Sequence, residues 1–162
     1  MRVLVISDTH GKDENLNKVL EMEKNRDMLF HLGDIEGREG YISLNSNCPC
    51  YMVAGNNDYF SPLKNILVVD VGSHKVLLTH GHHFYVSLST EYLKAEAIAQ
   101  GCDIVMYGHT HKPEVDVDDE VTVVNPGSLS YPRQEGRLPS YVIMEIDDET
   151  QEVHYTIKYL NK

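Results

Sequence analysis

The segment RVLVISDTHG (residues 2–11) joins a short run of mostly branched apolar residues to a polar loop. The run predicts a buried β-strand, because it is rich in branched side chains and far shorter than the ~20 residues of a membrane helix. It is followed by Ser7, Asp8 and His10 and not by a small-residue cleavage site, so we do not interpret it as a signal peptide. A carboxylate and an imidazole are therefore expected just beyond the end of a strand.

Length and charge limit the class of protein. The chain has 162 residues, of which 41% are hydrophobic and 24% are charged, and this fits one domain over residues 1–162. Its formal net charge of -11 disfavours binding to the phosphate backbones of nucleic acids. A small anionic substrate would need a local positive charge, which a bound metal ion can supply. We therefore expect no nucleic-acid partner and no membrane segment.

The three cysteines are Cys48, Cys50 and Cys102. Their odd number and the spacing CPC match neither a disulfide framework nor a CxxC metal pair. A reduced, cytoplasmic setting is therefore expected, with Cys102 packed as a small hydrophobic residue. The sequence leaves a homo-oligomer open.

Strand-like and helix-like patterns alternate in the first part of the chain, and hairpins follow. Helical spacing predicts helices over residues 15–24, with Asp13 as a cap, and over residues 89–100, with Gly101 after it. This order predicts a two-sheet α/β sandwich with helices on the outer faces. The further strand segments are MLFHLGD (28–34), CPCYMVA (48–54), NILVVDV (65–71), KVLLTHG (75–81) and DIVMYGH (103–109), and hairpins are expected over residues 111–127 and 139–160.

Five of these strands stop at residues that can bind a metal ion. Ligands of open α/β sheets gather beyond the carboxyl ends of the strands. A mixture of carboxylate, amide and imidazole suits Mn, Fe, Zn, Ni or Co better than calcium or magnesium alone. The clusters are Asp8-Thr9-His10, Gly33-Asp34, Gly55-Asn56-Asn57-Asp58, His80-Gly81-His82 and Gly108-His109-Thr110-His111.

Each cluster alone has an ordinary structural explanation. Asn56 and Asp58 could form an Asx turn, and a lone His80 at a strand end is more often structural. His109 and His111 are harder to dismiss, because residues i and i+2 of an extended chain point the same way. Five such clusters, all at strand ends, favour one shared metal site.

Taken in order, the motifs Asp-x-His, Gly-Asp, Gly-Asn-x-Asp, His-Gly-His and Gly-His-x-His resemble those of the calcineurin-like metallophosphoesterase superfamily. The segments SDTHG, GHTHKP and VNPGSLSYPR are most similar to its small bacterial and archaeal phosphodiesterases. The resemblance runs from the first strand to about Arg133 and, with the C-terminal hairpin, covers nearly the whole chain. It implies a metal-dependent phosphodiesterase that hydrolyses small phosphodiesters.

The resemblance also implies a dinuclear site. Two divalent ions, preferably Mn²⁺ and otherwise Ni²⁺, Fe, Zn²⁺ or Co²⁺, would share Asp34 as a bridge and a hydroxide that attacks phosphorus. The first ion would be held by Asp8, His10, Asp34 and His111, and the second by Asp34, Asn56, His80 and His109.

Other residues receive supporting roles. His82 competes with His80 for one ligand position, and the family pattern assigns the ligand to His80 and leaves His82 near the substrate. Asp58 would hold a ligand histidine or its loop in place. The candidates for contact with substrate are Asn57, Arg38 and Arg133, although a solvated surface position is the alternative for both arginines. Asn125 would lie near the site. His31, His74 and His154 are expected to be structural, and His83 is expected to be an exposed loop residue.

One position departs from the larger members of the superfamily. They carry a histidine after the Gly-Asn pair to protonate the leaving group, and here that residue is Asn57. An amide cannot act as a general acid near neutral pH, and such help is typically worth ~10²–10⁴-fold. Phosphodiesters with a stabilised leaving group are therefore expected to be better substrates than alkyl phosphates.

Two alternative functions are a phosphomonoesterase of the same fold and a non-catalytic binding scaffold. The retromer scaffold subunit has a similar fold with a degraded metal site. Here every ligand position holds a metal-competent residue, which favours an enzyme, and Asn57 argues mildly against a general monoesterase.

Overall fold

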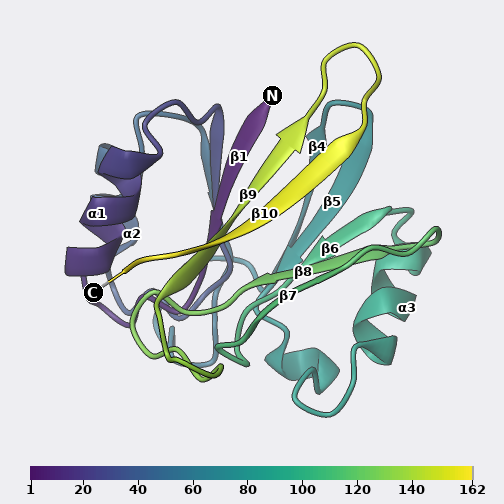
Figure 1. Ribbon diagram of the computed structural model, residues 1–162. Helices are drawn as coiled ribbons and strands as arrows, with labels where there is room; N and C mark the ends of the chain where they lie inside the picture. Colours follow the sequence, from purple (N-terminus) through teal and green to yellow (C-terminus); the bar gives the residue numbers. More distant parts are fainter. Residues whose placement is uncertain (162) are drawn as a thin grey trace.

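The computed structural model describes residues 1–161 and contains two five-stranded sheets with helices on their outer sides (Figure 1). This arrangement confirms the predicted two-sheet α/β sandwich. Within residues 1–161 we find no helix with the length and apolar character needed to cross a bilayer.

The first sheet has the strand order β10-β9-β1-β2-β3. The central strands β1, β2 and β3 are parallel to one another, and β9 runs antiparallel to both of its neighbours. The parallel strands therefore direct their carboxyl ends to the same edge. The bounds are β1 (Arg2–Ile6), β2 (Met28–His31), β3 (Cys50–Met52), β9 (Ser140–Ile146) and β10 (Val153–Tyr159).

The second sheet has the order β4-β5-β6-β8-β7. Here β5, β6 and β8 are parallel, while β4 and β7 are antiparallel edge strands. Both predicted hairpins of this region, β4–β5 and β7–β8, are confirmed. The bounds are β4 (Ile66–Val71), β5 (His74–Thr79), β6 (Ile104–Met106), β7 (Pro113–Asp116) and β8 (Thr122–Pro126).

The opening strand β1 is buried on both faces. Val3 and Val5 pack between the two sheets, while Leu4 and Ile6 pack under the first helix, and all four are fully buried. Successive side chains of a strand point to opposite faces, so a strand covered on both sides has a continuous apolar run. Each such side chain stabilises the fold by roughly 1.5–3 kcal/mol.

The helices cover the outer faces of the sheets. Helices α1 (Glu14–Met22) and α2 (Glu39–Asn45) lie on the first sheet, and α3 (Glu91–Ala99) lies on the second (Figure 1). A single 3₁₀ turn, η1 (His82–Phe84), follows β5. Cys102 is buried against α3 as predicted, and all three cysteines are free thiols.

One local expectation is met in part, and one helix was missed. Asp13 is the N-cap residue of α1, as predicted, but its side chain makes no capping hydrogen bond and pairs instead with Arg38. Helix α2 was not predicted from the sequence. Only Ile42 of this helix is buried, and the helix contains Gly40, a weak helix former, so the sequence shows no apolar periodicity there.

Candidate metal centre

The loops that follow β1, β2, β3, β5 and β6 meet at one end of the sandwich. Backbone hydrogen bonds join them: the amide of Asp8 donates to Gly33, and the amide of Gly108 donates to the carbonyl oxygen of His80. The first of these bonds lies within one sheet edge and the second within the other. The five predicted clusters are thus brought together from segments far apart in the sequence.

Asp8, His10, Asp34 and His111 form the first group of potential ligands. Ligand atoms of these four residues all lie within 4.8 Å of one another. His111 Nε2 is 3.0 Å from Asp8 Oδ1 and 3.4 Å from His10 Nε2. Three of the four side chains are buried, so their polar atoms converge away from bulk water.

Asn56, His80 and His109 form the second group. The side-chain oxygen of Asn56 lies 3.0 Å from His80 Nε2 and 2.9 Å from His109 Nδ1. Asp34 connects this group to the first, because its Oδ2 atom is 3.5 Å from His80 Nε2 and 3.8 Å from His10 Nε2. The arrangement places one carboxylate within reach of both groups.

The outer nitrogen of each of three histidines is held by an acceptor. His80 Nδ1 donates to the carbonyl of Leu32 and His111 Nδ1 to the carbonyl of Tyr131, each at 2.7 Å. His10 Nδ1 donates to the carboxylate of Glu36, also at 2.7 Å. Since these oxygens only accept, Nδ1 of each ring carries a proton, and Nε2 is the nitrogen that faces the centre and can bind a metal ion.

The first group has the electronic character of a cation site. His10 and His111 direct their Nε2 atoms at each other, and the buried Asp8 Oδ1 accepts no hydrogen bond from residues 1–161. When both Nε2 atoms are unprotonated, three acceptors face one another without a donor, and a positive ion between them removes their repulsion. Imidazole and carboxylate ligands also match transition metals. The residues present therefore fit the divalent metal that the fold implies.

The carboxylates of the centre are held ionised. Burial acts to raise the pKa of Asp34, but hydrogen bonds from His80 and Asn57 and the charge of His80 outweigh it and lower this pKa. The pKa of Asp8 is lowered in the same way, because contacts with His111 and His80 exceed the effect of burial. Both groups thus supply negative charge at neutral pH.

Five of the predicted ligand residues have a strained backbone. Asp8, His10, Asp34, His109 and His111 all have left-handed φ values, between 47° and 67°. Non-glycine residues rarely adopt this region, and such conformations cluster at functional sites. The expectation that His109 and His111 point together from an extended chain was therefore wrong. A left-handed bend at each residue directs the two rings to different groups.

Two glycines permit close approach to the carboxylates. A Cβ atom on Gly55 would overlap Asp34 Oδ1, and one on Gly108 would overlap the side chain of Ser7 and crowd Asp8. Neither glycine needs a left-handed φ. Their role is to leave room for a ligand side chain rather than to allow a bend.

The two residues after Asn56 support the centre in different ways. Asn57 donates its backbone amide to Asp34 Oδ1 and its side-chain amide to Asp34 Oδ2. Asp58 accepts from the backbone amides of Ile35, Glu36 and Gly55, at 2.7–2.9 Å. Asp58 therefore holds the loops of Asp34 and Asn56 together and contacts no ligand histidine.

The other residues predicted to contact or protonate the substrate differ in their distance from the centre and in their contacts. Arg38 is engaged by Asp13 and lies over the ring of Tyr41, so its guanidinium is already paired. His82 lies beside the second group, with its ring centroid 5.4 Å from that of His80. Burial and the neighbouring histidines lower the pKa of His82 to about 4, which disfavours it as a proton donor near neutral pH. Arg133 lines cavities next to the centre.

The other polar residues have structural contacts. His31 is fully buried between Thr9 and the amide of Gly33, and burial lowers its pKa to about 3, so it is neutral. Asn125 donates to the carbonyl of Gly108 and the hydroxyl of Thr110, which steadies the loop of the ligand histidines. His74 binds Asp103 and the carbonyl of Gln151, as expected of a structural residue. His83 is exposed as predicted, and His154, which was predicted to be structural, is exposed too.

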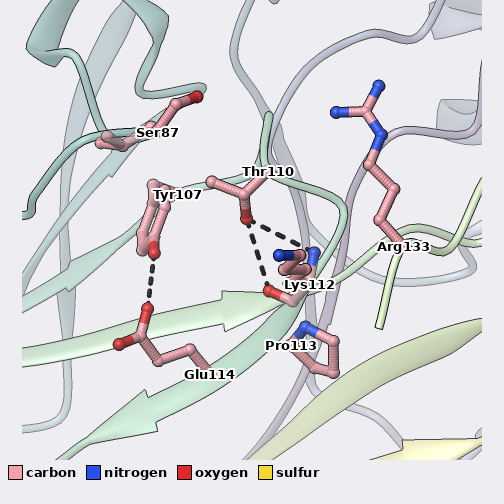
Figure 2. Close-up of a pocket in the computed structure, with 8 residues that line it drawn as sticks. Ser87, Tyr107, Thr110, Lys112, Pro113, Glu114 and Arg133 are labelled. Carbon is pink, nitrogen blue, oxygen red and sulfur yellow. Dashed lines mark hydrogen bonds between the residues drawn. The ribbon is translucent and has the colours of Figure 1, made fainter. Parts of the chain in front are cut away.

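Two cavities open beside the loop of His109 and His111. The first, of about 610 Å³, contains Tyr107, whose hydroxyl donates to Glu114 at 2.6 Å (Figure 2). The second, of about 470 Å³, is lined by His10, His111, Tyr131, Pro132, Arg133 and Arg137. Glu36, Tyr131 and Arg137 were missed by sequence reasoning, although Glu36 stands only two residues after the ligand Asp34.

Comparison with known proteins assigns the family. Residues 1–149 match the calcineurin-like phosphoesterase superfamily domain. The probable metallophosphoesterase YsnB of Bacillus subtilis is 34% identical over 158 residues, which cover 96% of this chain and 90% of YsnB. Phosphodiesterase MJ0936 of Methanocaldococcus jannaschii is 30% identical over 151 residues, which cover 78% of this chain and 83% of that protein.

A solved structure agrees. The crystal structure of a conserved protein from Streptococcus pneumoniae, described as a predicted phosphoesterase, has a TM-score of 0.81 and 32% identity to this chain. The match covers 95% of this chain and 87% of the other. On the sequence match over most of its length, this chain belongs to the calcineurin-like phosphoesterase superfamily.

Proposed function

We propose that the protein is a phosphodiesterase that hydrolyses small phosphodiesters with two divalent metal ions. The observation that carries this proposal is the position of Asp34. Its Oδ2 atom lies within 4 Å of His10 Nε2 on one side and His80 Nε2 on the other. A shared carboxylate between two cations reduces their mutual repulsion, which makes a dinuclear site favourable.

The protein groups would hold and orient the ions. Two ions bound there would supply a nucleophile at neutral pH and positive charge for the phosphoryl oxygens. The chain contributes preset ligand directions, because Leu32, Tyr131 and Glu36 fix three imidazole rings. Asn57 fixes both oxygens of Asp34 in the same way. The first ion would be held by Asp8, His10, Asp34 and His111, and the second by Asp34, Asn56, His80 and His109.

The absence of a side-chain acid at residue 57 supports a diester with a good leaving group. The amide of Asn57 is engaged with Asp34, and the lowered pKa of His82 makes that ring a poor proton donor. The leaving alcohol must then depart with little help from the protein, so an acidic alcohol is favoured. The name of the relative MJ0936, a phosphodiesterase, supports the same substrate class.

Hydrolysis of two aryl phosphates tests the proposal. Protein stripped with chelator and reloaded with Mn²⁺ or Ni²⁺ should hydrolyse bis(p-nitrophenyl) phosphate with a kcat/KM about tenfold or more above that for p-nitrophenyl phosphate. No turnover with any divalent ion would overturn the enzyme proposal. A preference for the monoester would instead favour the phosphomonoesterase alternative.

A further inference from the structure

The positive side chains of this acidic protein are unevenly distributed. Many are neutralised by carboxylates, and the buried Arg26 donates to backbone carbonyls. Lys12, Lys112, Arg133 and Arg137 form no ion pair with a carboxylate in the part of the chain that the structure describes, and they lie around the two cavities beside the metal centre. The ion-paired cations are Arg2, Lys18, Lys24, Arg38, Lys94 and Lys158. Within residues 1–161, Lys64 and Lys75 also form no ion pair, but neither lines these cavities.

The smaller cavity is the more basic of the two. Arg133 and Arg137 line it together with His10 and His111, and none of its described lining residues is a carboxylate. Lys12 adds a charge at its edge, because its ammonium lies 4.1 Å from the centre of the Tyr131 ring that lines the cavity. In a chain of net charge -11, this is an unusual concentration of uncompensated positive charge. An anion is attracted there, and arginine forks bind phosphate through two parallel hydrogen bonds.

The larger cavity is less suited to an anion. It contains Glu114, whose carboxylate accepts from Tyr107, so a negative group would be repelled there. Arg133 borders both cavities, and its side chain extends away from Glu114 (Figure 2). The side chain is therefore available to a group bound on the other side, beside Arg137.

The loop of the two arginines is tied to the metal centre. The amide of Arg133 donates to the carbonyl of His111 at 3.0 Å, and the carbonyl of Tyr131 receives His111 Nδ1. The amide of Arg137 closes a turn on Gln134. These bonds keep the arginine loop at a defined position from the ligand Nε2 of His111. A molecule that reaches from the centre to the arginines is thus selected by its length as well as its charge.

We infer that the substrate is a phosphodiester that carries a second phosphate on one ester arm, and that Arg133 and Arg137 bind this phosphate in the cavity beside His10 and His111. The inference rests on the proposed phosphodiesterase function and narrows its substrate class. The scissile phosphate lies at the metal centre, and the second phosphate neutralises the positive charge of Arg133 and Arg137. A diester whose ester arms are uncharged would leave the two guanidinium groups without an anionic partner.

Two matched substrates test the inference. Thymidine 5′-(p-nitrophenyl phosphate) and its 3′-phosphorylated form share one leaving group and differ only in the second phosphate. The 3′-phosphate should raise kcat/KM about tenfold, the effect expected of a charge-assisted contact. The Arg133→Ala/Arg137→Ala protein should reduce this ratio to about one. Lys75→Ala, which removes an unpaired lysine at the opposite end of β5, should retain it.

Binding gives a second measurement that needs no turnover. Calorimetric titration of the Mn²⁺-loaded protein should show that thymidine 3′,5′-bisphosphate binds about tenfold more tightly than thymidine 5′-monophosphate. The double variant should lose this difference. Equal binding of the two nucleotides to the native protein would overturn the inference, and so would a preference that survives in the double variant. If the preference is present but no diester is hydrolysed, the phosphate site at Arg133 and Arg137 is supported, whereas the proposed function, and with it the diester substrate, fails.

Discussion

Asn57 donates two hydrogen bonds to Asp34, one from its backbone amide to Oδ1 at 2.9 Å and one from its side chain to Oδ2 at 2.7 Å. The residue next to the predicted ligand Asn56 thus orients the carboxylate that connects the two groups of ligands. It holds the centre in shape, whereas a histidine at this position could donate a proton to a leaving group.

The first prediction concerns this position. Asn57→His should supply a general acid, so diesters with poorly acidic leaving alcohols should gain most, by about tenfold to a hundredfold in kcat/KM. The measurement is the slope of log kcat/KM against the pKa of the leaving alcohol in a series of aryl and alkyl diesters. That slope should become shallower in Asn57→His.

Asn57→Ala is the matched control. It removes the side-chain bond to Asp34 and adds no acid, so rates should fall for every diester while the slope stays that of the native protein. The same steep slope in Asn57→His would show that residue 57 cannot reach the leaving group.

The second prediction concerns the bridging role of Asp34. Asp34→Asn removes the negative charge between His10 and His80, so repulsion between two cations would no longer be offset. Metal content after equilibrium dialysis should fall from two ions per chain to one or fewer, with loss of hydrolysis. Asp70→Asn, which alters an exposed carboxylate on β4, should keep both ions. If Asp34→Asn still binds two metal ions tightly, then Asp34 does not act as the bridging ligand.

Much of this centre could be predicted from the sequence, for a physical reason. The branched run before Asp8 is buried on both faces, so its pattern is plain, and parallel strands place their following residues at one edge. Ordered motifs then predicted the ligands, and the structure brings these residues together. The left-handed backbone at His109 and His111 could not be predicted, because it arises from how the loop packs against Asp8 and Asn56.

Other features depend on contacts between distant segments. Arg38 was a candidate for substrate contact, yet it pairs with Asp13, 25 positions away in the sequence. Arg137 belongs to no motif, and it lies in a turn closed on Gln134, at the cavity that Arg133 also lines. Such roles follow from tertiary distances, about which local patterns say little.

The third prediction concerns space beside the metal centre. Gly55→Ala would drive a Cβ atom into Asp34 Oδ1 and its backbone nitrogen, so the loop or the carboxylate must shift. We expect loss of metal binding together with about 1–3 kcal/mol of stability, as for overpacked sites in general. Gly40→Ala is the matched control, because nothing lies within 4 Å of its added Cβ inside α2. It should be neutral or stabilising by about 0.5–1 kcal/mol. Equal metal affinity of Gly55→Ala and Gly40→Ala would contradict the close approach of Gly55 to Asp34.

The fourth prediction concerns stability in acid. Glu23 is buried, and its carboxylate accepts from Tyr141 at 2.8 Å, Lys158 at 2.7 Å and Arg2 at 2.6 Å. Burial acts to raise its pKa, but the hydrogen bonds from Lys158, Arg2 and Tyr141 outweigh it, so the pKa in the folded protein lies below the unfolded value. A depressed carboxyl pKa stabilises the fold above the unfolded pKa of about 4.3 and loses that effect as the pH falls through the folded pKa.

Urea unfolding from pH 7 to pH 2.5 measures this effect. Glu23→Gln should lower the free energy of unfolding at pH 7 by about 1–3 kcal/mol, because it leaves Lys158 and Arg2 without their shared anion. Its free energy should also decline less steeply below about pH 4.3, so that the two proteins converge in acid, where the native carboxyl is itself protonated. Glu21→Gln, which alters an exposed carboxylate in the last turn of α1, two residues before Glu23, should follow the native curve. If the free energies of unfolding of Glu23→Gln and of the native protein change with pH in parallel, then Glu23 has the same pKa in the folded and the unfolded protein. The network around Tyr141 would then not be the source of acid sensitivity.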